Sequence, residues 1–265
     1  MVPQFFGEKV SLIMKKEASR QEESTVFEGM TSISAVLGGR YRKINKVYID
    51  EDRTDNNRRK IDFLKAKSRE LGFPIEYTNA DFIESLTTGN SHGGIIALCS
   101  ERVIPSIGDE ELSDEGFYVM IDGIEDPYNF GYALRTLYAA GVDGVVLTKR
   151  NWMSAAGVVC RSSAGASELL PLWTADGEEA ALYFKSKGIK VVAAGIRDSV
   201  SAFDADLKKP LFLIVGGEKR GISAKVLALA DTIVRLDYGR EFKGSLSAAS
   251  SASVLAYEIL RQNRK

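Results

Sequence analysis

The sequence is poor in cysteine and nearly devoid of histidine. Only two cysteines, Cys99 and Cys160, occur in 265 residues, and this count excludes a disulfide framework or a cysteine-based zinc site. Each lies in or beside an apolar run, so we expect both thiols to be buried. A Ser-His-Asp triad would have to rest on the one histidine, His92, and no serine or carboxylate pattern accompanies it. We therefore expect a metal-free site that uses other groups.

Long apolar runs are also missing. No stretch approaches the roughly 18 apolar residues that a membrane span needs. The amino-terminal residues lack the long apolar core of a secretory signal, which predicts a cytoplasmic protein without a membrane partner. The composition is 45% hydrophobic and 27% charged with a formal net charge of −1, which is typical of globular proteins and does not by itself indicate nucleic acid.

The order of apolar and polar segments predicts an α/β protein with two domains. Residues 1–25 are polar and mixed in charge, and we interpret them as a loosely held extension. A small α/β domain is expected at 26–100. Its first helix has Ser32 or Ser34 near its start, and its second places Ile61, Leu64 and Leu71 near one face, with Gly72 at its end. The expected helices cover 31–40, 59–72 and 80–87, and the expected strands cover 44–50, 74–78 and 93–100.

A second α/β series follows an acidic segment, 101–116, that we interpret as a linker. Continuous apolar strands separated by helices in 117–265 predict a mainly parallel sheet covered on both faces. The expected strands cover 117–122, 144–148, 169–173, 190–196, 211–217 and 232–237, and the expected helices cover 130–140, 154–165, 177–187, 223–229 and 247–262.

Basic residues cluster twice in the first domain. Arg40, Arg42 and Lys43 lie in GGRYRKINK, and Arg58 and Arg59 lie in NNRRK. Such clusters make phosphate contacts in nucleic-acid-binding proteins. A solvated charged face is the alternative interpretation.

The stretch GIEDPYNFGYALRTLYAAG, 123–141, combines a crowded polar turn with a helix. The turn follows the expected strand 117–122, and open α/β sheets bind ligands at the carboxyl ends of their strands. Asn129 is placed to cap the helix and Gly141 to follow its end. Capping alone would explain Asn129. Arg135 lies about 240° around the helix from Asn129, so the two do not automatically share a face.

Two further loops follow apolar strands. In VGGEKRGIS the glycines Gly216, Gly217 and Gly221 nearly match a phosphate loop, but Ile222 stands where the lysine belongs, which argues against an ATP site. The loop, which also contains Glu218, is either a backbone cradle for a ligand or a structural turn. In GSLSAASSAS the small residues let a helix, capped by Ser245 or Ser247, approach a neighbour or a ligand closely. Their shared position after strands of one sheet favours a common site.

These three segments, in this order and spacing, resemble the motifs of the SpoU/TrmH family of RNA ribose 2′-O-methyltransferases, of the SPOUT class. RSSAGASELLPLW, 161–173, also matches, and 26–100 is similar to the RNA-binding substrate domain of many members. The resemblance implies a SPOUT domain at 117–265 with a carboxyl-terminal trefoil knot, which ordinary topology rules would not predict. It also implies S-adenosylmethionine as cofactor, a homodimer with the site near the subunit interface, and RNA as substrate, ribosomal more than transfer RNA.

Site residues are carried over by matching the motifs. The implied catalytic residues are Asn129, Arg135, Glu218, Ser245 and Ser247. The implied cofactor-binding residues are Ile196, Gly216, Gly217, Gly221, Leu236, Ser245 and Leu246. The implied RNA-binding residues are Arg40, Arg42, Lys43, Arg58, Arg59 and Arg135.

The sequence departs from the family pattern at three places. Ser247 replaces the asparagine of Ser-Leu-Asn, Asp237 and Tyr238 replace the proline and methionine of Ile-Pro-Met, and Tyr128 stands where histidine is common. Two alternatives therefore stay open, a catalytically weakened RNA-binding member of the fold and an enzyme acting on transfer RNA. A small-molecule nucleotide-binding enzyme is disfavoured, because both the phosphate-loop lysine and a GxGxxG pattern are missing.

Overall fold

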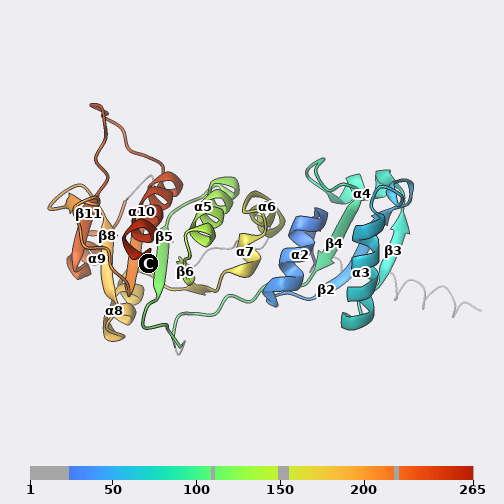
Figure 1. Cartoon of the computed structure of the whole chain (residues 1–265), viewed down its shortest axis with the longest axis horizontal. Helices are drawn as coiled ribbons and strands as arrows, with labels where there is room; N and C mark the ends of the chain where they lie inside the picture. The colour runs from blue at the N-terminus through green and yellow to red at the C-terminus, as the bar shows by residue number, and fades with distance from the viewer. Residues whose placement is uncertain (1–23, 109–110, 149–154, 218–220, 265) are drawn as a thin grey trace, which may run out of the picture. The chain divides into compact units, whose positions relative to one another are not determined.

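The computed structural model describes residues 24–108, 111–148, 155–217 and 221–264 (Figure 1). The chain divides into two compact units, Met1–Arg102 and Val103–Lys265. Glu218, one of the implied catalytic residues, lies outside the described residues, as does most of the expected extension 1–25.

Within residues 24–102, the first unit is a four-stranded mixed sheet with three α-helices. The strand order is β1-β4-β2-β3, in which β4 is antiparallel to β1 and β2, while β3 is parallel to β2. The strands are β1 (Thr25–Glu28), β2 (Ile44–Asp50), β3 (Ile75–Thr78) and β4 (Ile95–Cys99). The helices are α2 (Gly29–Gly39), α3 (Arg58–Leu71), α4 (Ala80–Leu86) and the single 3₁₀ turn η1 (Glu51–Arg53).

The expected elements of this unit are present, with local differences. β1 was not predicted, and α2 begins directly after it at Gly29, so Ser32 is buried inside the helix rather than at its start. In α3, Ile61 and Leu64 are buried as predicted and Gly72 ends the helix with a φ of 79°. Leu71 is exposed, so its assignment to the buried face was wrong.

The lone histidine and the two cysteines are all buried inside the fold. His92 is buried, and its Nδ1 accepts a hydrogen bond from the Gly94 amide at 3.1 Å. Both Cys99 and Cys160 are buried, which confirms that prediction. None of the described helices is long and apolar enough to cross a membrane.

The second unit contains a seven-stranded sheet in which every strand pairing is parallel, in the order β7-β6-β5-β10-β8-β11-β9. This confirms the predicted parallel sheet. The expected strand at 169–173 starts later, because Leu169 still belongs to a helix, and the two-residue β9 was not predicted. The strands are β5 (Phe117–Asp122), β6 (Gly144–Leu147), β7 (Leu172–Thr174), β8 (Lys190–Ala194), β9 (Val200–Ser201), β10 (Leu211–Gly216) and β11 (Thr232–Arg235).

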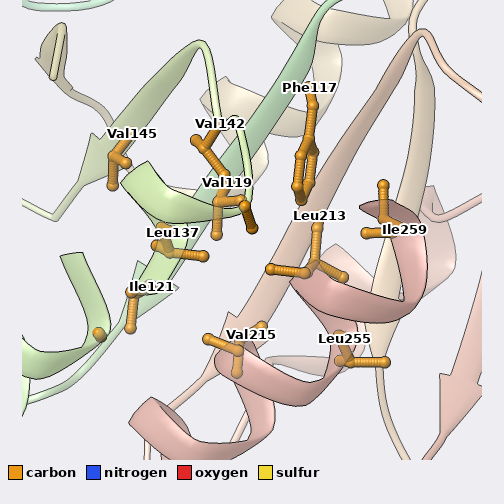
Figure 2. Close-up of a cluster of buried hydrophobic side chains, with 14 of the residues drawn as sticks. Phe117, Val119, Ile121, Leu137, Val142, Val145, Leu213, Val215, Leu255 and Ile259 are labelled. Atoms are coloured by element: carbon orange, nitrogen blue, oxygen red, sulfur yellow. The ribbon is translucent and has the colours of Figure 1, made fainter. Parts of the chain in front are cut away.

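Helices cover both faces of this sheet, as predicted. On one face, α10 and α5 pack against odd-numbered residues of β5 such as Val119, with Leu255 and Leu137 among the contacts (Figure 2). On the other face, α8 and α9 cover the even-numbered residues such as Met120, and Phe184 stacks on the ring of Phe212 at 4.0 Å. The helices are α5 (Pro127–Ala139), α6 (Ala156–Ser162), α7 (Ala166–Leu169), α8 (Gly177–Ser186), α9 (Ala224–Leu229) and α10 (Ala248–Asn263).

The segment before β5, interpreted from sequence as a linker, packs on the second unit. Ser106 forms a parallel bridge with Thr174 at the β7 edge, and the Ile107 amide donates to the Thr174 carbonyl at 2.9 Å. The Ser113 amide donates to the Tyr118 hydroxyl at 2.9 Å. The segment is therefore fastened to the sheet at both of these points.

Candidate functional site

The candidate site lies at the carboxyl edge of the parallel sheet. β5, β10, β8 and β11 are neighbours in the sheet, so the connections that follow them all leave at one edge. The chain winds from β5 outward to β6 and β7, whereas β10 and β8 lie on the other side of β5. The reversal between β5 and β10 is a topological switch point, where open α/β sheets bind their ligands.

At this reversal the backbone after β10 lies in close contact with the backbone after β5. A Cβ on Gly217 would lie 2.6 Å from the Asp122 carbonyl oxygen and 2.8 Å from the Gly123 Cα, so only glycine fits. A Cβ on Gly216 would lie 2.5 Å from the Gly221 carbonyl carbon, and the Gly221 amide donates to the Gly217 carbonyl at 3.0 Å. Gly221 has a φ of 60°, in the left-handed region that favours glycine, and it bridges to Gly217. These glycines therefore have a structural role in the turn.

The helix α5 begins one turn earlier than the sequence indicated. Asp126 is its N-cap, and the Asp126 Oδ1 accepts a hydrogen bond from the Asn129 amide at 2.8 Å. Pro127 is the first helical residue, so Asn129 is the third, and the prediction that Asn129 caps the helix was wrong. The missed signal was the Asp-Pro pair, which is typical of a cap followed by the first helical position. Gly141 follows the helix with a φ of 79°, as predicted.

Arg135 is exposed on α5 and makes no hydrogen bond or ion pair with any other residue that the structure describes. Tyr128 and Tyr132 precede it at the spacing that places three residues on one helical face, and both side chains are exposed. Asn129, also exposed, projects from a different face. The surface beside Arg135 is therefore aromatic and carries an exposed guanidinium.

The connection after β11 is tied to the connection after β8. Arg235 Nε lies 2.9 Å from the Asp237 Oδ1, and Arg235 Nη1 donates to the Ser199 carbonyl at 2.7 Å. A hydrogen bond from Ser201, together with Arg235, holds the pKa of Asp237 below its usual range. The aspartate that replaces the family's proline therefore anchors this connection by polar contacts.

The end of the same connection caps α10. Ser247 is the N-cap, and its Oγ accepts from the Ser250 amide at 3.1 Å, which settles the choice between Ser245 and Ser247. Serine and asparagine rank together as N-caps, so the replacement of asparagine by Ser247 keeps this function. The Leu246 amide donates to the Tyr238 hydroxyl at 3.3 Å.

The implied cofactor residues all lie at this edge. Leu236 packs against the core where β11 ends, while Ser245 and Leu246 are exposed. Ile196, two residues beyond β8, is 82% exposed. Backbone polar groups and exposed aliphatic side chains at one edge suit a ligand with a flat apolar part and polar substituents. Among the described residues there is no group of three or more side chains suited to hold a metal.

The basic residues that the sequence analysis singled out in the first unit form two separate groups. Arg40 and Lys43 are exposed before β2, whereas Arg58 and Arg59 are exposed after it, at the start of α3. A strand of this length separates its ends by roughly 20 Å. Arg42 differs from the others, because its Nη1 donates to the Ser100 carbonyl at 3.0 Å and its guanidinium lies 5.0 Å from the Phe27 ring centre.

Known families match both parts of the chain. The SpoU rRNA Methylase family matches residues 116–257, and the family described as RNA 2′-O ribose methyltransferase substrate binding matches residues 26–103. The 23S rRNA (guanosine-2′-O-)-methyltransferase RlmB of Shewanella oneidensis is 25% identical, over 92% of this chain and 99% of that protein. The protein of the same name from Ralstonia nicotianae is 26% identical, over 91% of this chain and 96% of its own length.

Solved structures share the fold. An AdoMet-bound rRNA methyltransferase from Sinorhizobium meliloti superposes with a TM-score of 0.78 at 22% identity, covering 94% of this chain and 92% of that one. A structure described as an RNA 2′-O ribose methyltransferase gives a TM-score of 0.75 at 23% identity, covering 98% and 96%.

Proposed function

The chain belongs to the SpoU rRNA methylase family, and on that premise we propose that it transfers a methyl group from S-adenosylmethionine to a ribose 2′-hydroxyl of RNA. Ribosomal RNA is the proposed substrate, because two relatives that this chain matches over nearly the whole of their length are named as 23S rRNA methyltransferases. A ribosomal substrate would place the protein in the cytoplasm. The observation that carries the proposal is the exposed Arg135 on the helix that follows the switch-point strand β5.

The carboxyl edge of the sheet fits S-adenosylmethionine. The reversal at Gly216 and Gly217 brings backbone amides and carbonyls to this edge without side chains, and exposed Ile196 and Leu246 add apolar surface for an adenosyl group. When bound, the cofactor supplies an activated methyl group. The proposed holding residues are Ile196, Gly216, Gly217, Gly221, Leu236, Ser245 and Leu246.

Arg135 acts on the RNA by charge rather than by taking a proton. A guanidinium does not deprotonate in proteins, so it cannot be the general base. It can grip a phosphate with two parallel hydrogen bonds and stabilise the negative charge that develops on the 2′ oxygen. Asn129, Ser245, Ser247 and Glu218 are proposed to orient the ribose, and such alignment contributes several kcal/mol to catalysis.

The direct test is methylation of unmodified 23S rRNA by the wild type and by Arg135→Ala. We expect Arg135→Ala to lower the transfer rate by about 100-fold or more, as loss of a charge-stabilising donor does, while its affinity for S-adenosylmethionine, measured by calorimetry, is unchanged. Lys225→Ala is the matched control, because Lys225 is an exposed cation beside the opposite face of the sheet. Mass spectrometry of digested RNA locates the methyl group on ribose.

Each outcome separates the alternatives. Near-wild-type transfer by Arg135→Ala would overturn the role of the arginine. Transfer to transfer RNA alone would change the substrate. A wild-type protein that binds S-adenosylmethionine but methylates neither RNA would be the non-catalytic RNA-binding member.

The protein is proposed to act as a homodimer through the face formed by α5 and α10. A groove of about 600 Å³ opens there, and exposed Phe203, Val254 and Tyr257 lie along it. Exposed apolar side chains gathered in this way are typical of interfaces. Tyr257→Glu should shift sedimentation from dimer to monomer, whereas Leu182→Glu, equally exposed on α8, should not. A wild-type monomer at micromolar concentration would contradict the proposal. The trefoil knot stays a prediction.

The first unit is proposed to bind RNA through its exposed cations. Arg40, Lys43, Arg58 and Arg59 are available for phosphates, whereas Arg42 is engaged by Ser100. The separation of the two groups along β2 implies phosphate contacts at two places rather than one.

A further inference from the structure

The connection between β11 and α10 extends beyond the rest of the second unit's sheet (Figure 1). It carries two aromatic side chains, Tyr238 and Phe242. The Tyr238 and Phe242 side chains are 41% and 56% exposed. Their ring centres are 5.6 Å apart with planes at 69°, an edge-to-face pair. Neither residue belongs to the hydrophobic core clusters of the second unit, so core packing does not account for them.

Local contacts hold both rings in place. The Tyr238 hydroxyl accepts from the Leu246 amide and so bridges the two ends of the connection. The Phe242 ring lies against Gly244, where a Cβ would be 2.7 Å from the ring. The pair is therefore an ordered surface rather than two isolated side chains, and its free faces point to solvent.

Two cations, Arg240 and Lys243, lie next to these rings in the chain, with one carboxylate, Glu241, between them. Arg240 and Lys243 are exposed, and within the described part of the chain neither forms a hydrogen bond or an ion pair. Exposed aromatic rings beside unpaired cations are the combination with which proteins bind single-stranded nucleic acid, because bases stack on the rings and phosphates meet the charges. The connection begins and ends at Leu236 and Leu246, which are proposed to hold the cofactor.

We propose that Tyr238 and Phe242 form a stacking platform for an unpaired RNA base next to the methylated nucleotide, with Arg240 and Lys243 contacting the flanking phosphates. This inference rests on the proposed function and names how the same site holds its RNA. The adenine of S-adenosylmethionine is the other flat ring at this edge. The two cations favour RNA, because the cofactor carries a positive sulfonium whereas RNA is a polyanion.

The test compares a base-bearing RNA with an RNA that lacks bases. Binding is measured to an oligouridylate of about 12 nucleotides, a length that such sites accommodate, and to an abasic ribose-phosphate oligomer of equal length. Phe242→Leu keeps an apolar side chain but removes the ring, and it should weaken oligouridylate binding about 5- to 100-fold. It should leave binding of the abasic oligomer unchanged. Phe242→Trp restores a ring and should restore affinity.

Salt dependence separates the two kinds of contact. Lys243→Ala should lower the slope of log affinity against log salt by about 0.7, the value for one phosphate contact on a single strand, whereas Phe242→Leu should leave the slope unchanged. Tryptophan fluorescence during urea unfolding verifies that each variant is folded.

An equal loss of affinity for both oligomers in Phe242→Leu would overturn the stacking platform. Unchanged oligouridylate binding with weakened binding of S-adenosylmethionine would also overturn it and assign the rings to adenine. None of these measurements needs methyl transfer. A wild type that methylates no RNA would therefore refute the proposed function without deciding the base-stacking result.

Discussion

Gly217 is the position at which a single methyl group should test the geometry of the site. It follows β10, and the neighbouring pair Gly216 and Asp122 is the last in the ladder between β10 and β5. A Cβ at Gly217 would lie 2.6 Å from the Asp122 carbonyl oxygen and 2.8 Å from both the Cα and the carbonyl oxygen of Gly123. All three atoms belong to the backbone, so no side chain can turn aside to make room.

The expected cost follows from this crowding. To accept an alanine, the two backbones must separate by roughly half an ångström or more before they reach ordinary contact distance. Overpacking of this kind costs about 1–3 kcal/mol, and weakening the adjacent ladder hydrogen bond adds about 1 kcal/mol. The two costs together are about 2–4 kcal/mol. With a denaturant slope of about 2 kcal/mol per molar urea, the unfolding midpoint of the second unit should fall by about 1–2 M.

Urea unfolding followed by tryptophan fluorescence measures this change. Both tryptophans, Trp152 and Trp173, belong to the second unit, so their signal reports on the unit that contains Gly217. Gly239→Ala is the matched control, because a Cβ at Gly239 meets no atom within 4 Å and its φ is not left-handed. That control should change stability by about half a kcal/mol or less, or raise it slightly.

The same variants test the cofactor edge. Because the separation of β5 and β10 displaces the loop that carries Gly221, Gly217→Ala should also weaken S-adenosylmethionine binding by calorimetry. If Gly217→Ala unfolds at the same midpoint as Gly239→Ala, the reasoning from backbone contact is wrong. Weakened cofactor binding without any loss of stability would contradict it as well, because the strands would then separate at no cost.

Substitutions at two further positions, Asp126 and Glu258, test local contacts. Asp126→Ala should lower the free energy of unfolding by about 1 kcal/mol because α5 loses its N-cap, whereas Asp126→Asn keeps an acceptor and should be nearly neutral in the same urea assay. Arg261 donates to both carboxylate oxygens of Glu258 and, with Gln262, holds the pKa of that carboxyl below its ordinary 4.5. The carboxylate therefore contributes stability above about pH 4.5 that is lost as the pH falls through the lowered value. The stability difference between wild type and Glu258→Gln should shrink over that range, and a difference independent of pH would refute the assignment.

Much of the fold was predictable because its signals are local. The segments INKVYID and FYVMID gave β2 and β5 with their bounds, and Gly72 and Gly141 marked helix ends because left-handed backbone favours glycine. The predictions that failed depended on competing local signals. Asn129 resembled an N-cap, but the Asp-Pro pair before it supplied a better one. Leu71 matched the helical period, but it is the last residue of α3 and its side chain is exposed.

The candidate site was predictable only as a set of residues. Each motif could be recognised as a polar or glycine-rich loop after an apolar strand, and their order along the chain identified the family. A common site was expected because each loop follows a strand of one parallel sheet, but which strands become neighbours could not be derived from spacing. Nearly 90 residues separate the end of β5 from the start of β10, and no local pattern says that these two strands become neighbours.

The sequence by itself determined which segments become strands and helices, which loops carry glycine and small residues, and which family the motifs match, because these depend on neighbours along the chain. Only the tertiary structure decided that β5, β10, β8 and β11 are neighbours in that order, and that Gly217 touches the end of β5. It also decided that the basic residues of the first unit lie at opposite ends of β2. The physical reason is that strand pairing joins backbones far apart in sequence, and its register depends on the packing of the whole sheet.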